Sequence, residues 1–418
     1  MTLSPQQALA IELALDGANV FITGPGGAGK SFLIRELVAQ LERRGKVVYL
    51  TASTGIAAVN IGGTTLHAFA GVGLATEPVE LLFNGMRFHK KTLKRWQCDV
   101  LIVDEISMVD PNFFTKLNEL AKRVRRSGRA FGGIQLICCG DFFQLPPVQA
   151  ESALFAFETP AWREAQLQIV QLTQIFRQED AAFVATLNKV RWGQLDDEAR
   201  QTLLGRVGAQ LDCSDGIEPT RLYSTNVQVD RLNAQRLAAL PGTAETYTYR
   251  QTVTGLQARE KAKICAKIAQ DCRAEAEVQL KVGAQVMLLA NLSVENGLSN
   301  GSRGVVLGFE EEKGERLPRV RFANGLELPV PYYTWRIKSP DGWTVSHSQV
   351  PLRLAYGITH HKAQGLTLDR VELDLSNVFA PGQAYVALSR VRTLQGCSIS
   401  GLDLTRIRAH PRVVQFYQ

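Results

Sequence analysis

Short, continuously apolar runs alternate with amphipathic segments through the N-terminal part of the chain. The apolar runs are rich in β-branched residues, as in strands that are buried on both faces of a parallel sheet. Strand and helix in alternation predict a parallel sheet covered by helices. The predicted strands are Asn19–Thr23, Lys46–Thr51, Asp99–Asp104 and Ile134–Gly140, and the predicted helices are Ser4–Asp16, Lys30–Arg43 and Pro111–Arg125.

Two stretches break this alternation. Gly71–Trp96 carries a basic run from Arg87 to Arg95 and predicts an inserted subdomain. Lys281–Trp335 is rich in glycine and in alternating β-forming residues, with turn signals between them, and predicts a small antiparallel barrel. Strands and helices alternate again around this second stretch, so we expect a second α/β domain that the barrel interrupts. Its elements are Arg221–Ser224, Val227–Leu240 and Arg370–Leu375.

Composition narrows the class of protein. Of the 418 residues, 45% are hydrophobic and 21% charged, which is typical of globular domains and excludes a disordered chain. No segment approaches the roughly 18 apolar residues of a membrane helix, and the N-terminus lacks the basic region of a signal peptide, so we expect a cytoplasmic protein without membrane contact. The net charge of +7 permits a polyanionic partner. Seven cysteines without a Cys-x-x-Cys pair predict reduced thiols.

The segment Gly24–Ser31 reads GPGGAGKS and fits the pattern G-x-x-x-x-G-K-[ST]. It follows a predicted strand and precedes a predicted helix, which is the context that phosphate binding needs. Backbone N–H groups of such a loop surround phosphate oxygens, Lys30 would neutralise the β- and γ-phosphates, and Ser31 would bind Mg²⁺. A glycine-rich turn that matches by chance is the alternative, and both flanks argue against it.

Polar residues follow the next two predicted strands. Asp104 and Glu105 end one strand, where Asp104 would hold Mg²⁺ and Glu105 would polarise the attacking water; an acidic pair that caps the next helix is the alternative. Gln144 follows the other strand and would reach the γ-phosphate or the water. A proline-stiffened turn with a solvated glutamine explains Gln144 equally well.

Hydroxyl groups and basic residues suggest a nucleic-acid partner. Thr51–Ala58, together with Thr64–His67, offers hydroxyls and a helix N-terminus to a phosphodiester backbone, although ordinary N-capping by Thr54 is the more common explanation. The basic tracts Arg87–Arg95 and Lys122–Arg129 would attract phosphates, and a solvated charged face explains them as well.

These motifs occur in one order together with further ones. The chain thereby resembles the Pif family (petite integration frequency) of superfamily-one, subclass B DNA helicases, which are RecD-like, from Leu3 to Arg392. The motifs that carry the resemblance are TASTGIAA, GGTTLHAFAG, LIVDEISMVD, the run from AKRVRRSGRAFGG to CCGDFFQLPPV, LTQIFRQ, THHKAQGLTL and AYVALSRVR.

The resemblance implies roles for individual residues. Gln7 would read adenine, while Lys30, Glu105 and Gln144 would act in ATP hydrolysis. Arg177 and Arg390 would contact the γ-phosphate. Ala28 stands where many relatives have threonine, and we expect no loss. The further nucleotide-binding positions are Gly24, Gly26, Gly27, Ala28, Gly29, Ser31, Phe32, Gln364 and Gly365, and the positions that would hold single-stranded DNA are Thr54, Gly55, Thr64, His67, Thr225, Asn226, Thr359 and His361.

The family also implies an architecture of two RecA-like domains, each a parallel-sheet α/β fold. The first domain, 1A, would span residues 1–180 and carry the wedge subdomain 1B at about 71–96. The second domain, 2A, would span 181–280 and 346–418. A small barrel of the Src-homology type, 2B, would be inserted into it at 281–345.

The activity implied is an ATP- and Mg²⁺-dependent DNA helicase that moves 5′→3′ on single-stranded DNA and unwinds duplex, forked and possibly G-quadruplex DNA as a monomer. DNA repair, recombination and telomere maintenance are the processes that the resemblance implies. Two other classes remain open: a small-molecule kinase, which a second α/β domain disfavours, and a nucleotide-gated DNA-binding module that does not unwind.

Overall fold

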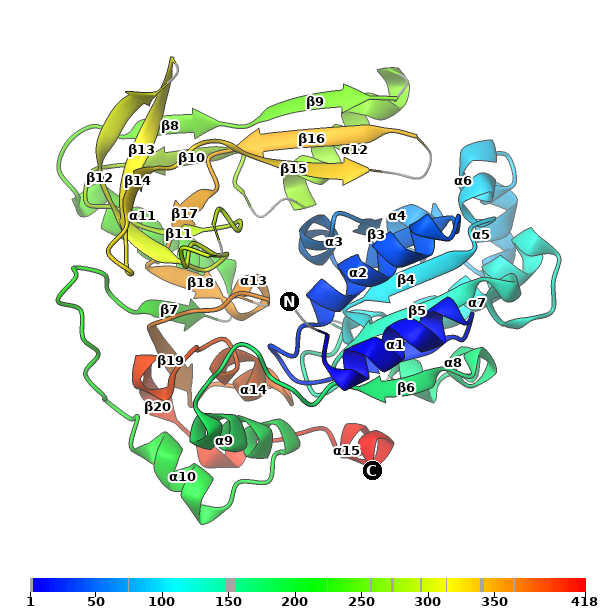
Figure 1. Ribbon diagram of the computed structural model, residues 1–418, viewed down its shortest axis with the longest axis horizontal. Coiled ribbons are helices and arrows are strands. Elements are labelled where there is room, and N and C mark those ends of the chain that lie inside the picture. Colours follow the sequence, from blue (N-terminus) through cyan, green and yellow to red (C-terminus); the bar gives the residue numbers. More distant parts are fainter. Residues whose placement is uncertain are drawn as a thin grey trace. The chain divides into compact units, whose positions relative to one another are not determined.

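The computed structural model describes residues 3–73, 75–147, 155–223, 225–255, 258–271, 274–293, 295–312, 314–338, 342–363 and 365–418 (Figure 1). The chain forms two compact units that each draw on three separate segments. Unit 1 comprises Met1–Gln174, Thr252–Cys272 and Trp335–Ser346. Unit 2 comprises Ile175–Gln251, Arg273–Thr334 and His347–Gln418.

Unit 1 is built on a six-stranded sheet with the order β3-β2-β4-β5-β1-β6. Every pair of neighbouring strands is parallel, so the predicted parallel α/β fold is confirmed. All four strands predicted in this part of the chain are present. The strands are β1 (Val20–Thr23), β2 (Val48–Ala52), β3 (Thr64–Thr65), β4 (Val100–Asp104), β5 (Gln135–Gly140) and β6 (Gln168–Gln171).

Alternate residues of β1 show how helices cover both faces of this sheet. Val20 and Ile22 point into a core that α1 (Pro5–Leu15) and α2 (Lys30–Arg43) complete. Phe21 points the other way and meets the Trp162 ring of α8 (Pro160–Ala165) at 5.1 Å between centroids. Trp162 in turn lies against α7 (Pro111–Arg125).

The predicted insertion near residue 80 consists of the short helices α5 (Val79–Met86) and α6 (Lys90–Arg95). It is fastened at its base, because the fully buried Trp96 donates its indole N–H to the Ala70 carbonyl at 3.3 Å. Lys116 of α7 donates to the Ala75 carbonyl at 2.7 Å. The neighbouring elements are α3 (Gly55–Ile61) and α4 (Leu66–Ala70).

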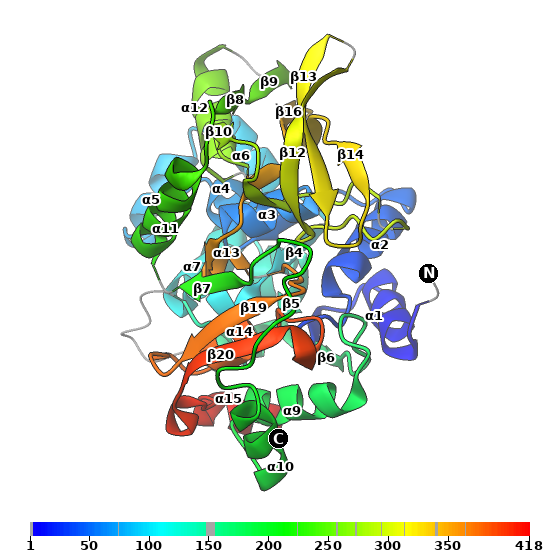
Figure 2. The ribbon, with the colours of Figure 1, turned by 90° about the vertical axis from the view of Figure 1, so that its left-hand side faces the viewer.

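Unit 2 contains a second parallel sheet, with the order β18-β7-β19-β20. Figure 2 shows β7, β19 and β20 lying side by side. One face of this sheet is apolar and packs against α9, α10 and α14. The elements are β7 (Thr220–Tyr223), β18 (Gly357–Thr359), β19 (Val371–Leu375), β20 (Cys397–Leu402), α9 (Ala181–Trp192), α10 (Asp197–Leu204), α11 (Asn226–Ala239), α13 (His360–Ala363), α14 (Gln383–Leu388) and α15 (Pro411–Tyr417).

The predicted barrel appears as an antiparallel sheet with the order β14-β13-β12-β11-β17. A paired β8-β10 and a sheet β15-β16-β9 accompany it. The helix α12 (Ala258–Asp271) lies between β9 and β10 in sequence. The strands are β8 (Glu245–Thr248), β9 (Arg250–Thr254), β10 (Glu277–Leu280), β11 (Gln285–Leu288), β12 (Arg303–Glu312), β13 (Glu315–Phe322), β14 (Glu327–Pro329), β15 (Tyr333–Lys338), β16 (Thr344–Gln349) and β17 (Leu352–Leu354).

The β-rich region is longer than the sequence pattern indicates. Its core includes Tyr247 and Val278, which precede the predicted start at 281, and Val350 and Leu352, which follow the predicted end at 345. The first segment of unit 1 ends at Gln174, whereas the predicted boundary of the first domain lies at 180. Residues 252–272 and 335–346 also belong to unit 1.

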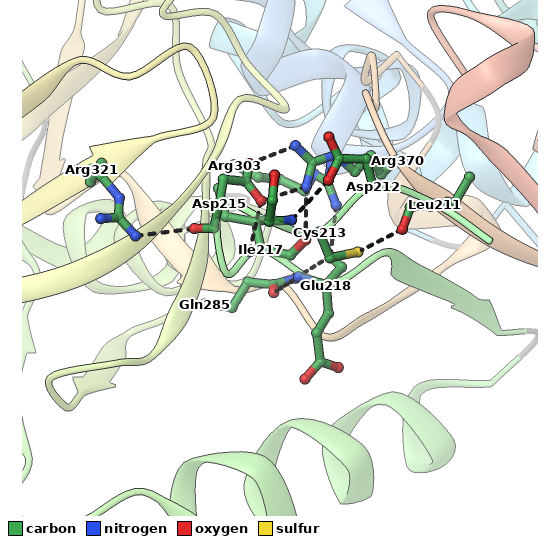
Figure 3. Close-up of polar contacts among 11 residues, drawn as sticks. Leu211, Asp212, Cys213, Asp215, Ile217, Glu218, Gln285, Arg303, Arg321 and Arg370 are labelled. Atoms are coloured by element: carbon green, nitrogen blue, oxygen red, sulfur yellow. Dashed lines mark hydrogen bonds and ion pairs between the residues drawn. The ribbon is translucent and has the colours of Figure 1, made fainter.

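A polar cluster joins the barrel to the parallel sheet of unit 2 (Figure 3). Arg370, which precedes β19, donates both guanidinium nitrogens to the Asp215 carboxylate at 2.6 and 2.5 Å. Arg303 of β12 donates to the Glu218 carbonyl at 2.8 Å, and Arg321 of β13 donates to the Asp215 carbonyl at 3.0 Å. The connection that leads into β7 is thus held by both the barrel and the sheet.

Charge and burial oppose one another in this cluster. Burial would raise the pKa of Asp215, but hydrogen bonds from Arg370 and from the Ile217 N–H hold that pKa below its usual value. Arg303 is fully buried, and burial lowers the pKa of its guanidinium to about 10, which leaves it charged at neutral pH. Asp215 thus pairs directly with Arg370, and the charges of Asp369 and Asp215 together favour the charged form of Arg303.

Candidate functional site: a phosphate loop and two neighbouring arginines

The loop between β1 and α2 has a backbone that only glycine fits well. Gly24 has φ +154°, and a β-carbon there would lie 2.6 Å from the Leu172 carbonyl oxygen. Gly27 and Gly29 have φ values of +88° and +80°, in the left-handed region. Gly26 completes the glycines of the loop, and the buried Ala28 packs into the core of unit 1. The loop thus has the conformation in which consecutive N–H groups form a concave anion site.

Lys30 begins α2 and turns back across this loop. Its ammonium donates to the Gly24 carbonyl at 2.7 Å and to the Pro25 carbonyl at 3.1 Å. Ser31 lies exposed in the first turn of the helix, and Phe32 is 36% exposed. The loop, the ammonium and the helix N-terminus therefore present positive charge at one point, as phosphate binding requires.

The acidic pair stands at the carboxyl end of β4. Asp104 is buried, and burial together with the charge of Glu105 raises its pKa, which the Lys30 ammonium partly offsets. The Lys30 charge therefore acts on the same carboxylate that would face a metal ion. Glu105 has φ 51° and ψ 47°, so the chain turns sharply after the strand, and its N–H donates to the Asp104 carboxylate at 2.9 Å.

Gln144 lies in the turn after β5 and is only 4% exposed. Its side-chain amide lies 3.4 Å from the Asp141 carboxylate. The alternative of a solvated glutamine is therefore wrong, because the side chain is held inside unit 1. A buried amide beside the ends of β4 and β5 suits a group that orients water or phosphate.

Gln7 already has a structural task. Its side-chain carbonyl accepts the Ser4 N–H at 3.0 Å, and its own N–H donates to the Ser4 hydroxyl at 3.2 Å, which forms a capping box at the start of α1. The side chain is 2% exposed. The amide nitrogen remains the atom that could address a base.

Arg177 and Arg390 are brought together in unit 2. The Arg177 guanidinium donates to the Ser389 carbonyl at 3.1 Å and to the Thr367 hydroxyl at 3.0 Å. Arg390 is buried and donates to the Val386 carbonyl at 3.0 Å. Sequence spacing does not reveal this pairing, because the two arginines lie in motifs at opposite ends of the unit.

Two neighbours of this arginine pair were missed by sequence reasoning. Gln178 is buried and donates to the Val391 carbonyl at 2.8 Å, so it fixes the strand of backbone that carries Arg390. Gly301, in the turn before β12, approaches Thr367 so closely that a β-carbon would lie 2.1 Å from the Thr367 carbonyl oxygen. In the sequence, the signal that could have identified Gln178 was its position next to Arg177, and the signal for Gly301 was its position in a predicted turn.

The predicted DNA-contacting residues of unit 1 have local structural contacts. The Thr54 hydroxyl accepts the Ala57 N–H at 3.2 Å, so the capping interpretation holds, and Gly55 is the first residue of α3. Thr64 lies in β3. The His67 ring stacks on Phe113 at 4.0 Å between centroids, which fixes its orientation.

In unit 2 the corresponding residues gather at the carboxyl ends of β7 and β18. Thr225 precedes α11 and Asn226 begins it. Thr359 is buried, and its hydroxyl accepts the Lys362 N–H at 3.3 Å. His361 lies in α13, Gly365 follows that helix with φ +77°, and Gln364 lies outside the described residues.

Within the described ranges no group of three or more His, Cys, Asp or Glu side chains is arranged to hold a metal ion. Ser31 and Asp104 fit the lighter demands of Mg²⁺, which keeps several waters and needs few protein ligands. A cation bound beside Asp104 would lower the raised pKa of its carboxyl group and favour the ionised form. In that described part of the chain no helix has the length and apolarity to cross a membrane.

The phosphate loop on a parallel sheet, the acidic pair at the end of β4 and the second α/β unit are the features of the phosphate-loop nucleoside triphosphatase fold class. The sequence pattern of PIF1-like helicases matches residues 3–201, and that of the DNA helicase Pif1 2B domain matches residues 265–309. The chain belongs to the PIF1-like helicase family.

Individual relatives agree with this assignment. The ATP-dependent DNA helicase PIF1 of Mus musculus is 42% identical over 99% of this chain and 62% of its own length. The crystal structure of Pif1 helicase from Candida albicans covers 100% of this chain and 99% of that chain, with 38% identity and a TM-score of 0.75. A Bacteroides Pif1 in complex with ADP-AlF3 and ssDNA covers 100% and 97%, with 29% identity and a TM-score of 0.65. The chain thus spans a little under two thirds of the mouse protein.

Proposed function

We propose that this chain is an ATP-dependent DNA helicase that moves 5′→3′ along single-stranded DNA. The observation that carries the proposal is the division of the hydrolytic groups between the compact units. Lys30, Asp104, Glu105 and Gln144 belong to unit 1, whereas Arg177 belongs to unit 2 with Arg390. If hydrolysis needs the residues of both units, then ATP turnover is coupled to movement of one unit against the other. Translocation requires such movement.

Each hydrolytic residue has a separate task in this mechanism. The loop N–H groups and Lys30 hold the phosphates, and Glu105 takes the proton of the attacking water. Gln144 orients that water or the γ-phosphate. Arg177 and Arg390 meet the charge that spreads over the γ-phosphate oxygens in the transition state. Gln7 presents its amide nitrogen to adenine, since its carbonyl is engaged in the helix cap.

Ser31 and Asp104 would hold Mg²⁺. The ion would neutralise charge on the β- and γ-phosphates. Asp104 must be ionised for this, and the nearby Lys30 ammonium favours the ionised form. Gly365 and Gln364 complete the proposed nucleotide contacts from the second unit.

Single-stranded DNA is the proposed track, as in the Bacteroides complex with ssDNA. Thr54, Gly55, Thr64 and His67 would hold it on unit 1. Forked and G-quadruplex DNA are the proposed structured substrates, with the chain acting as a monomer. On unit 2 the strand would contact Thr225, Asn226, Thr359 and His361.

The two insertions would serve strand separation. The helices α5 and α6 form the proposed wedge, the 1B subdomain, and the barrel forms the proposed 2B domain. The polar cluster around Asp215 supports a fixed barrel, because it ties β12 and β13 to the connection before β7. A barrel that is held against the connection before β7 would keep its position when DNA presses on it.

Two assays test the proposal. The ATPase rate should rise when oligo-dT is added, because the strand favours the state in which both sets of hydrolytic groups act together. A duplex with a 5′ single-stranded tail should be unwound, and the same duplex with only a 3′ tail should not. An ATPase that ignores DNA would favour a kinase-like enzyme, and DNA-stimulated turnover without unwinding would favour a nucleotide-gated binding module.

A further inference from the structure

A cavity of about 360 Å³ lies in unit 2, and β7 and β19 supply part of its lining. From β7 the chain continues to β18 on one side of the sheet, whereas from β19 it continues to β20 on the other side. The gap between β7 and β19 is therefore a topological switch point. In open parallel sheets the carboxyl end of such a point is where ligands bind.

The cavity lies over the polar face of this sheet. Leu222 and Leu373 point into the apolar core on the other face. Alternation along a strand then directs Tyr223 of β7 and Asp374 of β19 to the polar face, and both line the cavity. Tyr223 and Asp374 therefore lie on the face of the sheet opposite that apolar core.

The floor of the cavity is preorganised. Burial would raise the pKa of Asp374, but hydrogen bonds from Ser376 and Asn377 hold it below its usual value, so the carboxylate stays ionised. The Asn377 amide donates to it at 3.0 Å. Gly357 allows the Tyr223 ring to lie against β18, since a β-carbon there would be 3.3 Å from the ring. The cavity thus offers an aromatic ring beside fixed hydrogen-bond acceptors.

Two exposed apolar side chains adjoin lining residues in sequence. Val227 is 77% exposed and precedes the lining residue Gln228. Phe379 is 68% exposed and follows the lining residue Val378. The loop that carries Phe379 is fixed, because the Gln383 side-chain carbonyl accepts the Phe379 N–H at 3.1 Å. A solvent-facing phenylalanine that follows a lining residue in sequence, on a backbone held by a hydrogen bond, is suited to a flat, amphipathic ligand.

The cavity is continuous with residues that we propose to hold DNA. The Thr225 hydroxyl donates to the Gln228 side chain at 2.9 Å, and Gln228 lines the cavity. His360, another lining residue, directly follows Thr359. A strand that contacts Thr225 and Thr359 would pass the mouth of the cavity.

We propose that this cavity receives one unstacked nucleobase of the single strand, with the base against Tyr223 and Phe379 and its edge toward Asp374 and Gln228. The inference rests on the proposed function, because it needs a bound strand. Since the carboxylate accepts hydrogen bonds, bases with an exocyclic amino group should bind better here than thymine. A base has an aromatic face for stacking and a polar edge, and the cavity has a counterpart for each.

The test is a scan of abasic sites. Oligonucleotides of equal length, each lacking one base at a different position, are titrated against the full chain, and the dissociation constant is plotted against position. Loss of the base that fills the cavity should weaken binding about 5- to 100-fold at one position, the range expected for base–aromatic stacking. Replacing that base by cytosine should bind more tightly than replacing it by thymine.

Variants assign the sensitive position to this cavity. Tyr223→Leu and Phe379→Ala should each flatten the profile at that position, whereas Tyr223→Phe keeps the ring and should preserve it. Leu204→Ala is the matched control, because Leu204 is an exposed apolar residue of unit 2 outside the cavity. A flat wild-type profile, or a sensitive position that survives in both variants, would overturn the inference while leaving strand binding intact. No binding of any oligonucleotide would overturn the proposed function itself.

Discussion

The Arg177 guanidinium is fastened to the backbone beside Arg390, since it donates to the Ser389 carbonyl at 3.1 Å. Burial and, second, the charge of Arg390 lower the pKa of Arg177 to about 9. Two guanidinium groups held close together concentrate positive charge at one place in unit 2. We propose that this charge meets the γ-phosphate, for which two preorganised cations would be suited.

The first prediction concerns this pair. Arg177→Ala and Arg390→Ala should each retain ATP and DNA binding and lose DNA-stimulated hydrolysis by about 10³–10⁵-fold, as arginine fingers do. The double variant should be little worse than either single one, because both residues act on one closed state. The measurement is kcat at saturating oligo-dT. Wild-type turnover in either single variant would remove that arginine from the hydrolytic site.

The second prediction concerns Lys30. Lys30→Ala should abolish ATP hydrolysis, because the phosphates lose the ammonium that neutralises them. The fold should survive, since the hydrogen bonds of the Lys30 ammonium within the described residues go to the Gly24 and Pro25 carbonyls of a loop and not to a core element. Thermal unfolding monitored by circular dichroism provides the control. A folded variant with near-native DNA-stimulated turnover would refute the phosphate-loop assignment.

The third prediction separates the two acids at the end of β4. Glu105→Gln should bind Mg²⁺–ATP normally and hydrolyse it about 10²–10⁴-fold more slowly, because the water loses its proton acceptor. Asp104→Asn should instead weaken the binding of Mg²⁺, so that a titration of the metal against ATPase rate reaches half its maximum at a higher Mg²⁺ concentration. If Glu105→Gln lost nucleotide binding, Glu105 would be a metal ligand or a structural residue.

The fourth prediction concerns stability and pH. Asp215→Asn should lower the free energy of unfolding at pH 7 by about 1–3 kcal/mol, because Arg370 loses a paired carboxylate. The pKa of Asp215 is lowered in the folded state, so its stabilisation is present above the unfolded value of about 4 and is lost as pH falls through the folded pKa. Denaturant titrations should therefore converge for the two proteins in acid. A gap that stays constant down to low pH would mean that charge is not the cause.

The four inner strands of the parallel sheet in unit 1 were predictable because they are buried on both faces and leave continuous apolar runs. The edge strands β3 and β6 were not predicted, because β3 has two residues and β6 is mostly exposed. The boundaries of the barrel were not predictable from the sequence. Tyr247 and Val350 contribute to the barrel core, but they lie in or beside short strands that show no long periodic pattern. The alternation of polar and apolar residues in a strand such as Arg250–Thr254 covers too few residues to predict which sheet the strand joins. Boundaries of this kind are set by tertiary packing rather than by local preference.

The sequence predicted which residues are candidates for the site, but not the contacts that their side chains make. GPGGAGKS predicts a loop because its glycines can adopt the positive φ values of such a loop and disfavour a continuous helix or strand. The double use of Gln7, as helix cap and proposed base reader, needs two hydrogen bonds that no spacing reveals. The burial of Gln144 and the pairing of Arg177 with Arg390 likewise depend on which distant segments fold together.

Gly301 touches the backbone of Thr367 with no room for a methyl group, and Thr367 steadies the Arg177 guanidinium. The barrel turn at Gly301 therefore contacts Thr367 closely, and Thr367 contacts Arg177. A displacement of the barrel turn would shift Thr367 and, with it, the position of the Arg177 guanidinium. Under the proposed function, in which the barrel contacts DNA and Arg177 contacts the γ-phosphate, this contact would make the rate of ATP hydrolysis depend on the mechanical load that DNA places on the barrel.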